Sequence, residues 1–154
     1  MLDAFAGDFS GDDWDHALGG WHVVVDDAGV AVAHAAVVPR TLEVGSRPVR
    51  AGYVEAVGTA TARQGEGFGR RAMTEIGVVL REHFQMGALA TGDHDFYARL
   101  GWERWQGPTY VRDGSTLVRS AEEDDGIMVL RYGDSTDVDV TASISCEARA
   151  GDDW

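Results

Sequence analysis

Three glycines occupy alternate positions in a short polar segment, Gln64-Gly65-Glu66-Gly67-Phe68-Gly69. The residues before this segment are typical of a strand, and the residues after it have the spacing of a helix. Glycine lets the backbone approach a ligand closely, and the first N–H groups of a helix are unpaired donors at its positive end. The segment therefore favours a phosphate or pyrophosphate ligand, with Arg63, Arg70 and Arg71 as nearby positive charge.

The glycine spacing differs from the two commonest nucleotide-binding loops. A P-loop needs a lysine after its last glycine, but all 13 basic residues of the chain are arginine. A dinucleotide-binding turn has the pattern Gly-x-Gly-x-x-Gly, which Gly65, Gly67 and Gly69 do not follow. A glycine-rich connection with no ligand is the alternative on this pattern alone.

One acidic residue, Glu55, interrupts the apolar strand segment Tyr53-Val54-Glu55-Ala56-Val57. A carboxylate inside a sheet costs free energy unless it is paired or has a function. Such a group can take the proton of an ammonium, directly or through a water, so that the amine can attack an acyl carbon. The alternative is a half-exposed strand face on which Glu55 points into solvent.

A tyrosine stands in a short helical segment, Asp95-Phe96-Tyr97-Ala98-Arg99-Leu100, which Gly101 and Trp102 follow. A phenol within hydrogen-bond reach of a leaving group can donate a proton to it as a general acid. The alternative is that Tyr97 packs in the core and that Gly101 only ends the helix.

The hydrophobic pattern predicts the elements that hold these residues. Helices are expected over residues 12–18, 72–84 and 93–100. Strands are expected over residues 21–25, 30–38, 41–44, 49–61, 86–91, 102–111, 127–132 and 138–146, with a polar loop over residues 112–126. This order predicts a single domain, residues 1–154, with an α/β (α+β) fold: a mixed, mostly antiparallel central sheet flanked by helices.

Composition narrows the class of protein further. The net charge of −13 argues against a nucleic-acid partner and allows attraction of cationic ligands. No apolar run approaches the roughly 20 residues of a membrane span, and residues 1–5 do not begin a signal peptide. The single cysteine, Cys146, cannot form an internal disulfide, so we expect a cytoplasmic protein.

Two of these motifs resemble the GNAT superfamily of N-acetyltransferases: Gln64-x-x-Gly67-x-Gly69 resembles its pyrophosphate loop, and the Tyr97 segment resembles its helix before a Gly-aromatic strand entry. The resemblance implies acetyl-CoA as cosubstrate and no metal. It implies that Val57, Gly58 and Thr59 contact the acetyl carbonyl and pantetheine, with the Val57 N–H at the carbonyl, and that Tyr97 protonates the leaving thiolate. The coenzyme would further contact Gln64, Gly65, Glu66, Gly67, Phe68 and Gly69.

A narrower resemblance, from about residue 4 to the last residue, is to the aminoglycoside 2′-N-acetyltransferases. It is carried by Gly52-Tyr53-Val54-Glu55-Ala56-Val57, Tyr97-Ala98-Arg99-Leu100-Gly101-Trp102, Trp105-Gln106-Gly107-Pro108-Thr109 and Arg149-Ala150-Gly151-Asp152-Asp153-Trp154. The last block is the most specific of the four. The first strand of that family has no counterpart in this sequence, and Ala90 stands where a small hydroxyl residue is expected.

This resemblance implies a cytoplasmic homodimer that acetylates the 2′-amine of an aminoglycoside, with Glu55 as the base. It implies acceptor contacts from Asp8, Glu55, Ala56, Asp124, Asp152 and the carboxylate of Trp154. Two alternatives stand beside it: a transferase for another small polyamine or amino sugar, and a non-catalytic module that binds acetyl-CoA.

Overall fold

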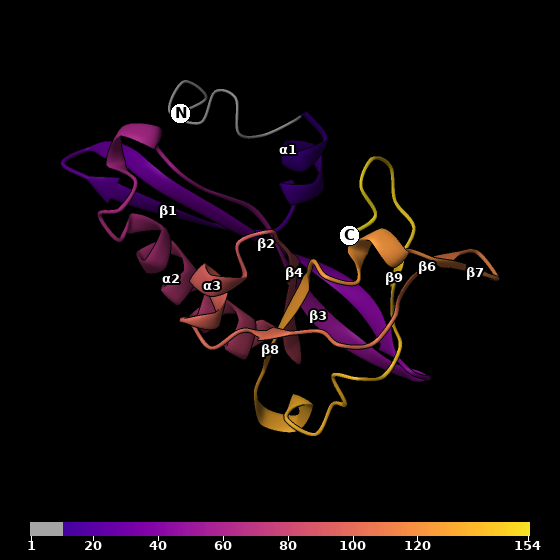
Figure 1. The fold of residues 1–154 in the computed structure, drawn as a ribbon. Coiled ribbons are helices and arrows are strands. Elements are labelled where there is room, and N and C mark those ends of the chain that lie inside the picture. Colours follow the sequence, from indigo (N-terminus) through magenta and orange to yellow (C-terminus); the bar gives the residue numbers. More distant parts are fainter. Residues whose placement is uncertain (1–10) are drawn as a thin grey trace.

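A curled, mixed β-sheet forms the centre of the molecule (Figure 1). The computed structural model describes residues 11–154, apart from the side chains of residues 12–14. The strands are β1 (Trp21–Asp27), β2 (Val30–Val44), β3 (Arg47–Thr59), β4 (Met86–Ala90), β5 (Glu103–Arg104), β6 (Thr109–Asp113), β7 (Thr116–Arg119), β8 (Ile127–Arg131) and β9 (Ile144–Glu147). Their order is β5-β8-β4-β3-β2-β9-β6-β7, and β1 also pairs with β2.

The helices are α1 (Gly11–Ala17), α2 (Phe68–His83) and α3 (His94–Ala98), with single 3-10 turns η2 (Thr61–Arg63), η3 (Ala121–Glu123) and η4 (Gly133–Ser135). Among the described strands, β3 with β4 and β6 with β9 run parallel, and the other pairs are antiparallel. The predicted mixed, mostly antiparallel α/β sheet is therefore confirmed.

Two apolar clusters cover the two faces of the sheet. On one face, α2 buries side chains at three- and four-residue spacing, including Ala72, Ile76 and Leu80, as its amphipathic pattern predicts. On the other face, Tyr53 of β3 packs in a cluster with Trp105 and the terminal Trp154. The last residue of the chain is thus part of a core.

The parallel pair β3–β4 is short, and this opens the sheet. The two strands are paired only from Ala51–Met86 to Tyr53–Ala88. Beyond Tyr53, β3 stays paired with β2 as far as Thr59, while β4 ends at Ala90. The two strands therefore separate at their carboxyl ends.

A β-bulge lies in β3 where the strands separate. Between two register pairs, β2 advances from His34 to Ala36 while β3 advances from Glu55 to Gly58, so β3 carries one extra residue. Ala56, within the bulge, has a positive φ of 50°. On a regular strand, residues 53 and 57 would point to the same face of the sheet, but the extra residue shifts the alternation. Tyr53 therefore packs in one apolar cluster, and Val57 packs against the other.

Histidines of the neighbouring strands hold the bulge. Nδ1 of the buried His34 lies 2.9 Å from the carbonyl oxygen of Ala56, and Nε2 lies 3.0 Å from Nδ1 of His22. Because a carbonyl only accepts, Nδ1 of His34 carries the proton, and Nε2 accepts from His22. Burial is the main reason that the pKa of His34 lies below its usual value, which favours this neutral form.

The sequence predicts a break between two strands, 30–38 and 41–44, where the structure has one continuous strand. Residues 41–44 are not a separate strand, because β2 runs unbroken from Val30 through Pro39 to Val44. Pairing with β1 extends to Val37 and pairing with β9 begins at Glu43, so at Pro39 the strand has β3 as its one described neighbour. A strand tolerates proline where one side is unpaired.

The second half shows three further differences. The strand predicted over residues 102–111 is broken into β5 and β6 at Gly107, where an added Cβ would lie 1.8 Å from the carbonyl oxygen of Ala142. The predicted loop over residues 112–126 contains β7, which a turn at Gly114 joins to β6. The strand predicted over residues 138–146 begins only at Ile144, because the Asp139 side chain accepts from the Thr141 N–H and hydroxyl and forms a turn.

No helix within residues 11–154 combines the length and the apolar character that crossing a bilayer requires.

Candidate functional site

A cleft of about 730 Å³ lies where β3 and β4 separate. Its walls are the end of β3, the loop before α2, the first turn of α2, and α3. It is lined by eight of the nine residues that the sequence predicts to contact the coenzyme: Val57, Gly58, Thr59, Gln64, Gly65, Gly67, Phe68 and Gly69. The ninth, Glu66, is not among the lining residues.

The glycine loop is built to present backbone N–H groups to this cleft. Gly65 and Gly67 have φ values of 80° and 86°, which disfavour any residue with a side chain. Gly67 is the N-cap of α2, and the first turn of the helix contains neither an acid nor a side-chain cap. The N–H groups at the start of α2 are therefore donors for an anion.

Arg63 fixes the shape of the loop. Its guanidinium donates to both carboxylate oxygens of Glu66, at 2.9 Å each, and to Asp27 of β1 at 2.7 Å. The hydrogen bonds from Arg63 hold the pKa of Glu66 below its usual value. Arg63 and Glu66 thus neutralise each other, while Arg70 and Arg99 line the cleft as positive charges.

Tyr97 lines the same cleft from α3. Its ring makes edge contacts with Phe96 and Trp102, at centroid distances of 4.9 Å and 6.1 Å, and its side chain is buried. The hydroxyl makes no hydrogen bond to another described residue. Burial, with a smaller contribution from Asp93, raises the pKa of Tyr97 to about 12, so the phenol keeps its proton at neutral pH.

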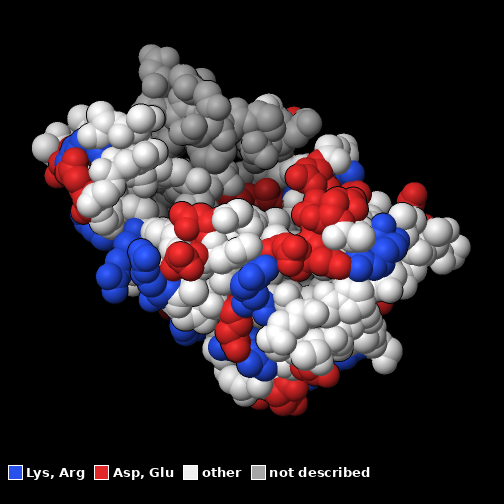
Figure 2. Space-filling view, viewed as in Figure 1, with Lys and Arg blue, Asp and Glu red and all other residues white. Residues whose placement is uncertain are grey.

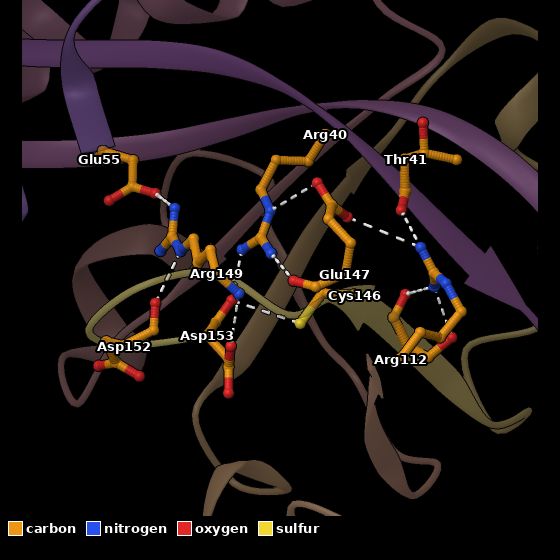
Figure 3. Close-up of polar contacts among 10 residues, drawn as sticks. Arg40, Thr41, Glu55, Arg112, Cys146, Glu147, Arg149, Asp152 and Asp153 are labelled. Atoms are coloured by element: carbon orange, nitrogen blue, oxygen red, sulfur yellow. Dashed lines mark hydrogen bonds and ion pairs between the residues drawn. The ribbon is translucent and has the colours of Figure 1, made fainter. Parts of the chain in front are cut away.

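Glu55 lies on the other side of the bulge, beneath the end of the chain (Figure 3). Its side chain is 8% exposed, which excludes the solvent-facing alternative. Oε1 accepts from Nη1 of Arg149 at 2.5 Å, and this ion pair joins β3 to the segment that follows β9.

The last residues of the chain fold back over β2 and β3. Arg40, a buried arginine of β2, donates to the carbonyl oxygens of Glu147 and Asp153 at 2.6 Å and 2.5 Å. Trp154 is 4% exposed, and its indole N–H donates to Ser120 Oγ at 3.1 Å. The terminal segment is thus held at both ends.

The two terminal acids have different surroundings. The Asp153 carboxylate accepts from the Arg149 backbone N–H at 2.8 Å and is part of the turn. The Asp152 side chain is exposed and has no hydrogen bond or ion pair with another described side chain. Its charge acts on Glu123, whose pKa is raised by burial first and then by the charges of Asp152 and Glu122.

Asp124 is engaged by its own loop. One oxygen accepts from the N–H and the hydroxyl of Thr109, both at 2.9 Å, and the carboxylate is paired with Arg119. These contacts, Arg119 first, hold the pKa of Asp124 far below its usual value. Asp125 is exposed and contacts Arg104, whereas Glu123 has no cationic partner among the described side chains and its pKa is raised by burial and then by Asp152.

The predicted acceptor residues are thus brought together only in part. Ala56 is in the bulge beside Glu55, while Asp152 and Trp154 are in the terminal segment that covers it. Asp124 is linked to the terminal segment only indirectly, by a chain of hydrogen bonds. Thr109 donates to Asp124, the Ser120 hydroxyl donates to Thr109 Oγ1 at 3.0 Å, and Ser120 Oγ accepts from Trp154. Asp8 lies outside the described residues. Figure 2 shows acidic side chains gathered on this part of the surface.

Three residues of the site have no signal in the sequence that would reveal their partners. Arg40, Arg149 and His34 each contact a residue more than 20 positions away in the chain. Buried cations and imidazoles of this kind become visible only once the fold brings the partners together. Among the described residues, no three or more His, Cys, Asp or Glu side chains are grouped as a metal site would require.

The sequence of the chain matches one known family. The family model of the acetyltransferase (GNAT) domain matches residues 9–105, which is more than half of the chain. The chain belongs to the GNAT acetyltransferases and is an N-acetyltransferase.

Within this family, a specific relative matches the whole chain. The sequence is 42% identical over 158 aligned residues to an aminoglycoside 2′-N-acetyltransferase from Mycolicibacterium fortuitum. The match covers 100% of this chain and 81% of the relative.

Solved structures share the fold at low sequence identity. A GNAT family N-acetyltransferase from Escherichia coli, solved with CoA, is 20% identical with a TM-score of 0.58; the match covers 81% of this chain and 66% of that one. A GNAT family acetyltransferase from Brucella melitensis, solved with acetyl-CoA, is also 20% identical, with a TM-score of 0.57 and coverages of 97% and 73%. At these identities the likeness concerns the fold alone.

Proposed function

We propose that this protein transfers the acetyl group of acetyl-CoA to an amine of an aminoglycoside, and that the amine is the one at the 2′ position. The observation that carries the proposal is the bulge at Ala56. On one side of the bulge, the Glu55 side chain contacts Arg149 of the terminal segment, and on the other side Val57 lines the cleft. The proposed base and the coenzyme cleft are therefore only two positions apart along β3. The 42% identical relative supports the choice of acceptor.

The residues of the cleft fit coenzyme A. The N–H groups from Gly65 to Gly69 would hold its pyrophosphate, and residues 57–59 would contact the pantetheine and the acetyl group. Acetyl-CoA supplies the acetyl group as a thioester. The Val57 N–H is proposed to donate to the carbonyl oxygen and to stabilise the negative charge that develops there.

The proton movements are assigned to two side chains. Glu55, directly or through a water, takes a proton from the acceptor's ammonium and so frees the lone pair of the nitrogen. The nitrogen then bonds to the carbonyl carbon, the carbon–sulfur bond breaks, the electron pair leaves on sulfur, and the nitrogen loses a second proton to solvent to give the neutral amide. Tyr97 donates its proton to that sulfur, which its pKa of about 12 permits at neutral pH.

Several acids are proposed to bind the acceptor's other groups. Asp152 and the Trp154 carboxylate would contact ammonium or hydroxyl groups, as would Asp124 and Asp8, with the Ala56 backbone beside them. A polycation is the natural partner of such a convergence of carboxylates. A cytoplasmic homodimer, which the resemblance implies, is part of the same proposal.

The test is release of free thiol from acetyl-CoA in the presence of kanamycin B, gentamicin or spermidine; the first two carry a 2′ amine. We expect thiol release with the two aminoglycosides and little with spermidine. Release with spermidine alone would point instead to a polyamine acetyltransferase, and release with none of the three would contradict the proposal.

A further inference from the structure

Glu55, the acid proposed to receive the acceptor's amine, is already paired with a cation of the protein. Arg149 Nη1 lies 2.5 Å from Glu55 Oε1, and the two side chains are 17% and 8% exposed. Among the described residues, Arg149 is the one hydrogen-bond partner of this carboxylate. A guanidinium therefore already pairs with the carboxylate that an acceptor's ammonium would need, through one of its two oxygens.

The arginine is also tied to the terminal segment (Figure 3). Its Nε donates to the Asp152 carbonyl oxygen at 2.6 Å, and its backbone N–H donates to the Asp153 carboxylate at 2.8 Å. The guanidinium carbon lies 5.6 Å from the centre of the Tyr53 ring. The terminal segment and the Tyr53 ring therefore hold the Arg149 side chain in the position from which it contacts Glu55.

The nearby acids are not neutralised in the same way. The Asp152 side chain is exposed, and neither it nor Glu123 has a cationic partner among the described side chains. Burial and then the charge of Asp152 raise the pKa of Glu123. The other buried arginine of this region, Arg40, is committed to Glu147 and to the Asp153 carbonyl oxygen. Of Glu55, Asp152 and Glu123, only Glu55 has a resident cation among the described side chains.

We propose that Arg149 is a specificity-determining residue that competes with the acceptor for Glu55. An ammonium that binds Glu55 replaces the Arg149 contact rather than adding a new one. A single ammonium therefore gains little net affinity at this position, and an acceptor binds well only if further ammonium groups reach Asp152 and Glu123. This inference rests on the proposed function, in which Glu55 receives an amine.

Calorimetric titration with glucosamine, which has one amine, and with kanamycin, which has several, tests the competition without turnover. Arg149→Met should tighten binding of both ligands by about 10- to 100-fold, the range of one charge-assisted hydrogen bond. Adding Glu55→Gln to this variant should abolish the gain, because no carboxylate is left to compete for. N-acetylglucosamine, which has no ammonium, should be unaffected.

Arg112→Met is the matched control. Its side chain is 19% exposed, it removes the same charge, and it pairs with Glu43 and Glu147 instead. We expect no comparable tightening in this variant. If Arg149→Met binds both ligands more weakly than the wild type, or if the double variant keeps the gain, the competition is contradicted.

A second variant covers the case in which Arg149→Met does not fold. Arg149→Lys keeps the charge but loses the planar group that contacts Glu55 and Asp152 together. It should give a smaller gain in the same direction, and an unchanged or weaker affinity overturns the inference. Thiol release by the wild type with gentamicin is measured in parallel; its failure would contradict the proposed function, whereas the glucosamine titrations would still decide the competition.

Discussion

At the residue scale, burial decides which protonation state of Tyr97 is present in the cleft. The phenol is buried against Phe96 and Trp102, and its pKa is raised to about 12. A raised pKa means that the neutral, proton-donating form is stable throughout the neutral and mildly alkaline range. The residue is therefore suited to be an acid and unsuited to be a base.

Tyr97→Phe should lower kcat by roughly 10- to 10³-fold, because the leaving thiolate then departs without a proton from the protein. The acetyl-CoA KM should change little, since the ring stays in place. In the wild type, kcat should show no alkaline decline attributable to this phenol until the pH approaches its pKa of about 12. A phenylalanine variant with wild-type kcat at all pH values would show that Tyr97 only packs.

Asp124 shows the opposite effect of surroundings on an acid. Its pKa is lowered by Arg119 and Thr109, so the folded state favours the ionised form more than the unfolded chain does. That stabilisation is complete above the ordinary pKa of 3.8 and is lost as the pH falls through the lower folded value.

Asp124→Asn should accordingly lower the melting temperature by a few degrees at pH 7, and the difference from the wild type should narrow in strong acid. Differential scanning calorimetry across this pH range measures both. Asp125→Asn is the control, because Asp125 is 96% exposed. A difference that is constant with pH would mean that the ion pair with Arg119 does not contribute.

At the element scale, the cleft depends on two backbone features, the bulge in β3 and the loop before α2. Gly67 has a φ of 86° and caps α2. A branched side chain there would both strain the backbone and block approach to the helix N-terminus.

Gly67→Val should raise the acetyl-CoA KM by at least about tenfold, the change that 1.4 kcal/mol of lost binding gives. Gly29→Val is a matched control, because Gly29 has nearly the same φ, 84°, but lies in the turn between β1 and β2. It should cost stability without changing the KM. Steady-state kinetics of both variants decide the assignment; equal KM values in the two would contradict it.

The elements with strong local signals were predictable from the sequence, and those set by distant contacts were not. The period of α2 and the glycine loop are local, and both were predicted. The bulge at Ala56 depends on His34 of the neighbouring strand, and the break at Gly107 depends on contact with Ala142. No pattern within either segment encodes these partners.

The site follows the same rule. Glu55 and Tyr97 stood out because their types were unusual for their segments. The pairing of Glu55 with Arg149 joins residues 94 positions apart, and no pattern in the sequence near either residue predicts it. The run of acids at residues 122–125 offered no local reason to separate Glu123 from Asp124, which differ through Arg119 and Thr109.

At the scale of the whole molecule, the terminal segment connects parts that are far apart in the sequence. His16 of α1 lies 2.6 Å from the Ala150 carbonyl oxygen, and Trp154 reaches Ser120 before η3. Removing residues 152–154 would take a buried indole out of a core, which costs about 3–5 kcal/mol. A truncation would therefore combine loss of stability with any loss of binding.

Asp152→Asn separates the two effects, because the Asp152 side chain is exposed. It should raise the aminoglycoside KM by about 10- to 100-fold, as one lost charge-assisted hydrogen bond implies. The acetyl-CoA KM and the melting temperature should stay close to those of the wild type. Asp113→Asn, another exposed acid but at the end of β6, is the control. An unaltered aminoglycoside KM would remove Asp152 from the site.

The most direct test of the whole account is the product itself. Kanamycin B or gentamicin, both of which carry a 2′ amine, is incubated with acetyl-CoA and the protein, the mass of the drug is measured, and the modified position is mapped by NMR. We expect a drug that carries one acetyl group on its 2′ nitrogen. A drug of unchanged mass, or one acetylated at a different nitrogen, would contradict this expectation.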